Sequence, residues 1–442
     1  MKDWLWMSMG DLGRGIAAGE VDPLALTETY LSAIKAHRFR DRIYARLTED
    51  RALAEAEAAS KRAKSGHRRG PLDGVPVSWK DLFDTAGTVT EAGTALLEGR
   101  VPDEDALVLK NATLAGTVCL GKTHMTELAF SGLGYNPITA TPPCVNDLDA
   151  VPGGSSSGAA TSVAFGLAAA AIGSDTGGSV RIPAAWNDLV GLKTTPGRLS
   201  LAGVVPLCAR FDTVGPLTRT VEDAALLLAA LAGGQAADLG GATLGGARFM
   251  VLDTIAFDDC RAEPRAGFDA AVARLSAAGA RISHAAFPEL AEAVALSGIL
   301  FTTEAYATWA DTIEANPDVM FAPVRDRFRS GANNSGPDYV AAWQRLDRIR
   351  ALWADHSAGY DAVLLPASPI LPPDAARLLS DPGYFAAENL LSLRNTRIGN
   401  LLGLCALTLP TGTPSCGLML MSAPHTEERL LRIGAAAESA LA

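Results

Sequence analysis

Two glycine-serine segments near the middle of the chain have the composition of catalytic loops. They span residues 152–158 and 173–183, and in each a glycine pair stands directly before a serine, Ser155 or Ser179. Glycine pairs favour positions where φ is positive or where another group approaches the main chain closely. Consecutive N–H groups in such a turn can converge on one point and hold a developing oxyanion. In the second segment these donors would be Thr176, Gly177, Gly178 and Ser179, which makes Ser179 the candidate nucleophile.

A serine hydroxyl is a weak nucleophile unless a base lies within hydrogen-bond reach. None of the six histidines falls inside either glycine-serine segment, whereas Lys80 ends an apolar stretch, residues 75–79, that has the pattern of a buried strand. Burial disfavours the ammonium form of lysine. Lowering a lysine pKa from about 10.4 to the 7 to 8 that suits catalysis corresponds to roughly 4 kcal/mol of environmental bias. We therefore expect Lys80 to act as the base.

The segments that must position these residues alternate between helical and strand patterns. Apolar periodicity and turn residues predict helices over residues 24–65, 107–116, 159–171, 264–278 and 427–442, with a further helix beyond Glu222. Strands are expected over residues 75–80, 117–120, 248–252, 280–284, 361–366, 405–410 and 418–421, and an extended loop over 136–154. Because this alternation flanks the glycine-serine segments on both sides, one interwoven domain is favoured over two separable ones.

Composition excludes several classes of protein. The net charge of −11 offers no basic surface for a phosphate backbone, so direct nucleic-acid binding is not expected. No apolar run approaches the eighteen or so residues of a membrane helix, and no signal peptide precedes the first helix, so we expect a soluble, cytoplasmic protein. The six cysteines form no C-x-x-C pair, which argues against a zinc or disulfide framework.

Several motifs taken together resemble the amidase signature family. They are the two glycine-serine segments, the sequence Gly-Val-Pro-Val-Ser-Trp-Lys-Asp at residues 74–81, the run 191–198 and the run 212–220. The resemblance is dense over residues 65–230 and loose elsewhere. It implies a single α/β/α domain over residues 1–442, with a large mixed twisted sheet covered by helices on both faces. Residues 1–65 would be a helical lead-in, 66–230 the signature core, and 231–442 the rest of the sheet and the substrate-entrance loops.

The resemblance also implies a proton relay. In that family the serine after the first glycine pair follows a cis peptide bond, here Gly154 to Ser155. Neutral Lys80 would accept a proton from Ser155, which would accept one from Ser179 as it attacks the carbonyl. Supporting roles would fall to Gly154, Ser156, Asp175 and Arg181. Asp175 would brace the loop, and Arg181 would pair with a nearby carboxylate. Ser157 stands where the family usually has glycine, which leaves the local loop shape open.

By resemblance, the activity is hydrolysis of a small carboxamide, an ester or a carbamate, without a metal or other cofactor. A stretch rich in aromatic residues, 287–343, is expected to form ordinary core, and the alternative is that it lines a substrate entrance suited to aryl groups. The expected pocket residues are Met125, Leu128, Tyr135, Tyr306 and Trp309. The oligomeric state is left open by the sequence, and a homodimer is compatible with it.

Four other interpretations of the chain are less well supported by the sequence. The A subunit of a glutamine-dependent tRNA amidotransferase would use the same relay, but the chain is short for such a protein, and aromatic residues suit glutamine poorly. A catalytically silent binding protein on the same fold is disfavoured because all three relay residues are present. Residues 154–158 match G-x-S-x-G, which would make Ser156 the nucleophile, yet no strand precedes them. Residues 116–123 match a nucleotide-binding loop, but the apolar strand falls between its glycines.

Overall fold

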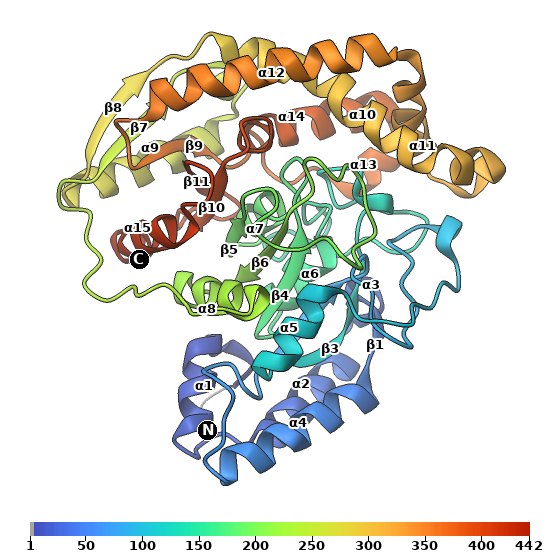
Figure 1. Ribbon diagram of the computed structural model, residues 1–442, viewed down its shortest axis with the longest axis vertical. Helices are drawn as coiled ribbons and strands as arrows, with labels where there is room; N and C mark the ends of the chain where they lie inside the picture. Colours follow the sequence, from blue (N-terminus) through green and yellow to red (C-terminus); the bar gives the residue numbers. More distant parts are fainter. Residues whose placement is uncertain (1–3) are drawn as a thin grey trace.

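An 11-stranded mixed sheet runs through the computed structural model, which describes residues 4–442 (Figure 1). The strands follow the order β1-β3-β2-β4-β6-β5-β10-β11-β9-β7-β8. Their bounds are β1 (Tyr44–Leu47), β2 (Pro76–Lys80), β3 (Val118–Thr123), β4 (Ala170–Ser174), β5 (Val190–Lys193), β6 (Val214–Thr218), β7 (Arg248–Leu252), β8 (Arg281–Ala285), β9 (Ala362–Pro366), β10 (Cys405–Pro410) and β11 (Gly417–Ser422).

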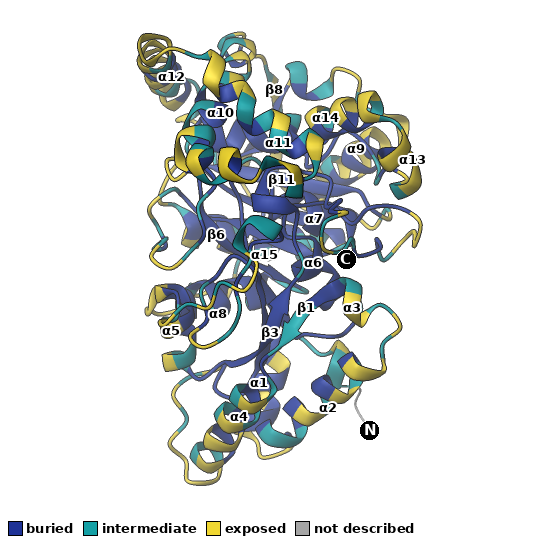
Figure 2. Cartoon of the chain, turned by 90° about the vertical axis from the view of Figure 1, so that its right-hand side faces the viewer, coloured by how far each residue is buried: buried dark blue, intermediate teal, exposed yellow. Residues whose placement is uncertain are grey.

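Helices flank the sheet, and its strands are mostly buried while the outer helices carry the exposed residues (Figure 2). The helices are α1 (Met9–Ala17), α2 (Pro23–Ala36), α3 (Arg40–Ile43), α4 (Glu49–Lys64), α5 (Leu107–Ala115), α6 (Ser157–Ala164), α7 (Arg181–Trp186), α8 (Val221–Ala232), α9 (Ala262–Ala277), α10 (Glu289–Ala315), α11 (Ala322–Arg329), α12 (Gly336–Ser357), α13 (Ala375–Ser380), α14 (Pro382–Leu401) and α15 (Glu427–Leu441). Within residues 4–442, none of them is both long and apolar enough to cross a membrane.

The strand order explains why two distant segments of the chain meet at one edge of the sheet. Strands β2 and β4 are parallel neighbours, and Trp79 lies beside Ile172 in the register. The carboxyl ends of parallel strands face the same edge, where loops build binding sites. Lys80 therefore comes to lie beside the end of β4 at Ser174. All residues of both strands are buried, which matches the apolar pattern that predicted β2.

All seven predicted strands are confirmed, whereas two helix predictions need correction and two further strands were missed. The lead-in is not wholly helical, because residues 44–47 form β1 through pairing with β3, a distant contact without a local signal. The expected helix over 159–171 ends at Ala164, since Gly166 takes a positive φ of 71° and the chain then enters β4. Strands β5 and β6 were not predicted; each carries a glycine in a short apolar run.

Candidate active site

Lys80 lies fully buried at the end of β2 with two serine hydroxyls around its amine. Its Nζ is 2.7 Å from Ser155 Oγ and 2.8 Å from Ser174 Oγ. Ser155 follows the Gly154 to Ser155 cis peptide bond, which confirms the expected backbone. Ser174 was not predicted as a site residue, although it stands directly beside Asp175 in the glycine-serine segment. The geometry thus supports the predicted contact between Lys80 and Ser155.

The environment of Lys80 lowers the pKa of its amine and so favours the neutral form, which can act as a base. Burial lowers its pKa from 10.5 to about 7, while the carboxylates of Asp175 and Asp212 oppose that shift. Desolvation dominates because the side chain has no exposed surface and no direct ion pair within residues 4–442. A pKa near 7 leaves a substantial fraction of the amine neutral, and therefore able to accept a proton, at neutral pH.

Backbone contacts join the two glycine-serine segments. The N–H of Ser156 donates to the carbonyl oxygen of Ser179 at 3.2 Å, which joins the residue after Ser155 to the candidate nucleophile. The Ser156 hydroxyl donates to the carbonyl of Ser174 and accepts from its N–H, at 3.2 and 3.3 Å. Its hydroxyl is fully buried and bonded to backbone, so Ser156 ties the first loop to the end of β4. This environment does not suit the alternative nucleophile of a G-x-S-x-G motif.

The turn before Ser179 presents unused N–H donors. None of the N–H groups of Thr176, Gly177, Gly178 and Ser179 donates a hydrogen bond to any residue of the described range 4–442. Gly178 has a φ of 142°, and a methyl group on it would lie 2.1 Å from Thr396 Oγ1. The Thr396 hydroxyl donates to the carbonyl of Gly177 at 2.8 Å and so fixes the turn. Free donors on a fixed turn are what an oxyanion site requires.

A buried ion pair supports the same turn from behind. The Asp175 carboxylate accepts from Arg181 Nε at 3.0 Å and Nη2 at 2.9 Å, and from the N–H of Val180 at 3.1 Å. Burial opposes ionisation of Asp175, but the charge and hydrogen bonds of Arg181 outweigh it and lower the pKa to about 2. Asn400 of α14 bonds both partners, at 2.9 and 2.6 Å. These contacts fit the roles that the resemblance implied, with Asp175 bracing the loop and Arg181 pairing with a carboxylate.

A cavity opens beside Ser179, and its walls come from segments that lie far apart in the chain. The inner end contains Ser179, Thr176 and Gly177. The rest of that end is lined by Ala129, Phe130, Ser131, Leu207, Phe301, Arg327, Leu393 and Arg397. It shares Phe130, Phe301, Arg327 and Arg397 with a wider cavity of about 670 Å³ between α10, α11 and α14. A small organic substrate fits such a volume.

The five predicted pocket residues do not line this cavity. Met125 and Leu128 are buried in the core, and Tyr135 packs edge-on against Phe321 and Phe385. The hydroxyl of Tyr306 donates to Glu314, and Trp309 Nε1 donates to the carbonyl of Pro206 at 2.9 Å. None of these five side chains is among the residues that line the cavity with Ser179. The aromatic wall comes from Phe130 and Phe301.

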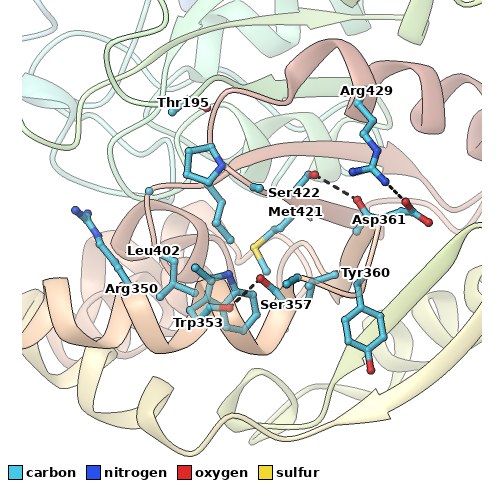
Figure 3. Close-up of a pocket in the computed structure, with 18 of the residues that line it drawn as sticks. Thr195, Arg350, Trp353, Ser357, Tyr360, Asp361, Leu402, Met421, Ser422 and Arg429 are labelled. Carbon is cyan, nitrogen blue, oxygen red and sulfur yellow. Dashed lines mark hydrogen bonds and ion pairs between the residues drawn. The ribbon is translucent and has the colours of Figure 1, made fainter.

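A second cavity, of about 430 Å³, lies against β9, β11 and the end of α12 (Figure 3). Trp353, Tyr360 and Met421 are among its lining residues, and Asp361 at its rim is bonded to Arg429. Within the described chain, its lining includes none of the lysine-serine cluster. The chemistry therefore belongs to the first cavity.

Comparison with known proteins agrees with this geometry. The chain matches the Amidase family over residues 25–431. A 2-amino-5-chloromuconic acid deaminase from Comamonas testosteroni is 36% identical over 98% of this chain and 96% of the relative. The A subunit of a glutamyl-tRNA(Gln) amidotransferase from Acidothermus cellulolyticus is 33% identical over 100% of this chain and 95% of the relative. A crystal structure of an amidase superimposes with a TM-score of 0.89 at 32% identity, covering 99% of this chain and 100% of the other.

The chain therefore belongs to the amidase signature family, as its motifs predicted. Within that family it is an amidohydrolase that acts on carbon-nitrogen bonds.

Proposed function

We propose that this protein hydrolyses a small carboxamide through an acyl-enzyme on Ser179. The observation that carries the proposal is the buried amine of Lys80, with its pKa lowered to about 7 and its Nζ 2.7 Å from Ser155 Oγ. The free N–H donors of the turn at residues 176–179 lie beside the cavity that Ser179 lines. Base, relay and oxyanion donors thus occur at one place.

The reaction needs two proton transfers in each direction. As Ser179 Oγ attacks the carbonyl carbon, its proton passes to Ser155 and the Ser155 proton passes to neutral Lys80. The oxyanion of the tetrahedral intermediate accepts hydrogen bonds from the turn. Lys80 then returns its proton through Ser155 to the leaving nitrogen, which departs as the amine. Water attacks the acyl-enzyme by the same route, and release of the carboxylic acid restores Ser179.

The walls of the cavity favour a substrate with an apolar or aryl part. Phe130, Leu207, Phe301 and Leu393 present carbon surface next to Ser179. Esters and carbamates with such groups are further substrates, because they form a tetrahedral intermediate at the same carbonyl. We propose that the protein acts in the cytoplasm without a metal or other cofactor, and that it does not bind nucleic acid directly. A homodimer is compatible with this proposal.

Labelling with a fluorophosphonate tests the nucleophile without knowledge of the substrate. We expect one covalent adduct by intact mass on the wild type and none on Ser179→Ala. The unmodified wild type should then be tested on anilides, esters and carbamates. The panel includes 2-amino-5-chloromuconic acid, because the Comamonas relative is named for its deamination. An adduct that persists in Ser179→Ala would refute the assignment of the nucleophile.

A second candidate function is the A subunit of a glutamine-dependent tRNA amidotransferase. The Acidothermus relative of that name supports it, because the match covers the whole of this chain. In that case the isolated chain would release little ammonia from glutamine and would co-purify with partner proteins. Turnover of an aryl amide by the isolated chain would favour the amidase.

A further inference from the structure

Two arginines stand in the wall of the cavity that contains Ser179. Arg327 lies on α11 and Arg397 on α14, and both line the inner end and the wider part of the cavity. Arg397 is only 7% exposed, and Arg327 is partly buried. Guanidinium groups remain protonated at neutral pH, so each brings a full positive charge to the cavity.

Among residues 4–442, neither guanidinium has an acidic partner. Arg327 Nη1 donates to the carbonyl of Phe130 at 2.8 Å, and its Cζ lies 4.2 Å from the centre of the Phe130 ring. Arg397 Nη1 donates to Ser297 Oγ at 3.3 Å, while its buried Nη2 has no hydrogen-bond partner in the described part of the chain. Across the same range, no carboxylate lies within ion-pair distance of either side chain. Buried charges are ordinarily paired, so this arrangement is costly without an anion.

The surroundings increase that cost. Burial lowers the pKa of Arg397, and burial together with the charge of Arg397 lowers the pKa of Arg327. The lining of these two adjoining cavities contains one carboxylate, Asp326, which is exposed and lies 3.0 Å from Arg325 Nε. An anion entering the cavity would offset the repulsion between the two guanidinium groups and would satisfy the free Nη2.

We propose that Arg327 and Arg397 bind a carboxylate of the substrate, so that the amide hydrolysed at Ser179 is one that carries a carboxylate. This inference rests on the proposed amidase function and specifies its substrate class. A planar carboxylate can accept two hydrogen bonds from a guanidinium, which gives orientation as well as attraction. The apolar surface of Phe130, Phe301 and Leu393 would then contact the carbon chain that joins the carboxylate to the amide.

Matched pairs of anilides test the proposal. The acids are the monoanilides of malonic, succinic and glutaric acid, and their neutral partners are N-phenylpropanamide, N-phenylbutanamide and N-phenylpentanamide. A further pair, 4-acetamidobenzoate and 4-methylacetanilide, places the carboxylate on the leaving group. We expect at least one acid to exceed its neutral partner by tenfold or more in kcat/KM, as measured by release of the arylamine.

Variants of the arginines assign that preference to residues. In Arg397→Gln and Arg327→Gln, the ratio of acid to neutral kcat/KM should fall by about 10- to 150-fold, the range for hydrogen bonds to charged groups. Arg397→Lys should keep part of the preference, because the charge remains without the planar fork. Arg329→Gln is the matched control: Arg329 is also on α11 but is bonded to Glu314, at 2.9 and 2.7 Å, and it does not line the cavity.

Binding to Ser179→Ala separates failure of this inference from failure of the proposed activity. The same pairs are titrated into that variant by calorimetry, a readout that needs no turnover. An acid that binds at least tenfold more tightly than its partner supports the carboxylate site even if fluorophosphonate labelling fails. The inference is overturned if no acid is preferred in binding, or if the preference is unchanged in Arg397→Gln while wild-type labelling at Ser179 proceeds normally.

Discussion

The pH dependence of Ser179 modification should report the ionisation of Lys80. Burial lowers the pKa of this lysine from 10.5 to about 7, a difference that corresponds to about 5 kcal/mol in favour of the neutral amine. Only the neutral amine accepts a proton, so activity is present above pH 7 and is lost as the pH falls. About nine-tenths of the sites should be competent at pH 8 and about one-tenth at pH 6.

The assay is the second-order rate constant for fluorophosphonate labelling, measured by quenched mass analysis from pH 5 to 9. We expect a plateau above pH 8 and a tenfold decrease per pH unit below 7. Among residues 4–442, burial also brings the pKa of Glu127, Lys193 and the half-buried Glu438 to about 7. Glu127→Gln and Lys193→Met should therefore keep the decrease in labelling rate below pH 7. Lys80→Met should label very slowly, and its rate should not show this decrease. This account of the base would be refuted if the labelling rate of the wild type fell with a midpoint near pH 10, or if the decrease below pH 7 persisted in Lys80→Met.

Three further variants probe how the site is held. Ser174→Ala removes one of the two hydroxyls at the catalytic amine and should lower kcat/KM about tenfold, measured on the best anilide. Arg181→Met leaves Asp175 buried without its partner and should reduce the free energy of unfolding by about 3 to 5 kcal/mol in urea titrations. Gly178→Ala should reduce the free energy of unfolding by about 1 to 3 kcal/mol, because the φ of Gly178 is 142° and the added methyl group would clash with Thr396. Gly177→Ala is its control and should cost less than about 1 kcal/mol, because the nearest atom to the added methyl group lies 3.6 Å away.

The cluster of Lys80, Ser155 and Ser179 that we propose as the catalytic centre could be located in the sequence because its signals are local. The strand that ends at Lys80 is a continuous apolar run, and the turns before Ser155 and Ser179 are marked by glycine pairs within a few residues. Ser174 carries the same kind of signal, since it precedes Asp175 at the end of β4. Such features depend on neighbouring residues, so one sequence is enough to find them.

The substrate cavity could not be predicted because its walls depend on long-range packing. Arg327 and Arg397 lie on helices whose charged residues, in sequence alone, have the pattern of a solvated surface. Trp309 and Tyr306 were expected to face the substrate, but Trp309 Nε1 donates to the carbonyl of Pro206 and the Tyr306 hydroxyl donates to Glu314 of the same helix, α10. Which face of a long helix meets the sheet is decided by tertiary contacts, and periodicity does not reveal which partner it meets.

Helix α14 connects substrate binding with the oxyanion turn. Asn389, Leu393, Arg397 and Asn400 follow one another at intervals of three or four residues, so they share one face of the helix. The first three line the cavity, while Asn400 bonds the ion pair behind the turn. Thr396 of the same helix holds the Gly177 carbonyl. Because one rigid element carries both sets of contacts, an anion bound at Arg397 would act on the helix that also fixes the donors for the oxyanion. In the proposed mechanism, the same face would therefore serve two requirements of an amidase, recognition of the substrate and alignment of its carbonyl.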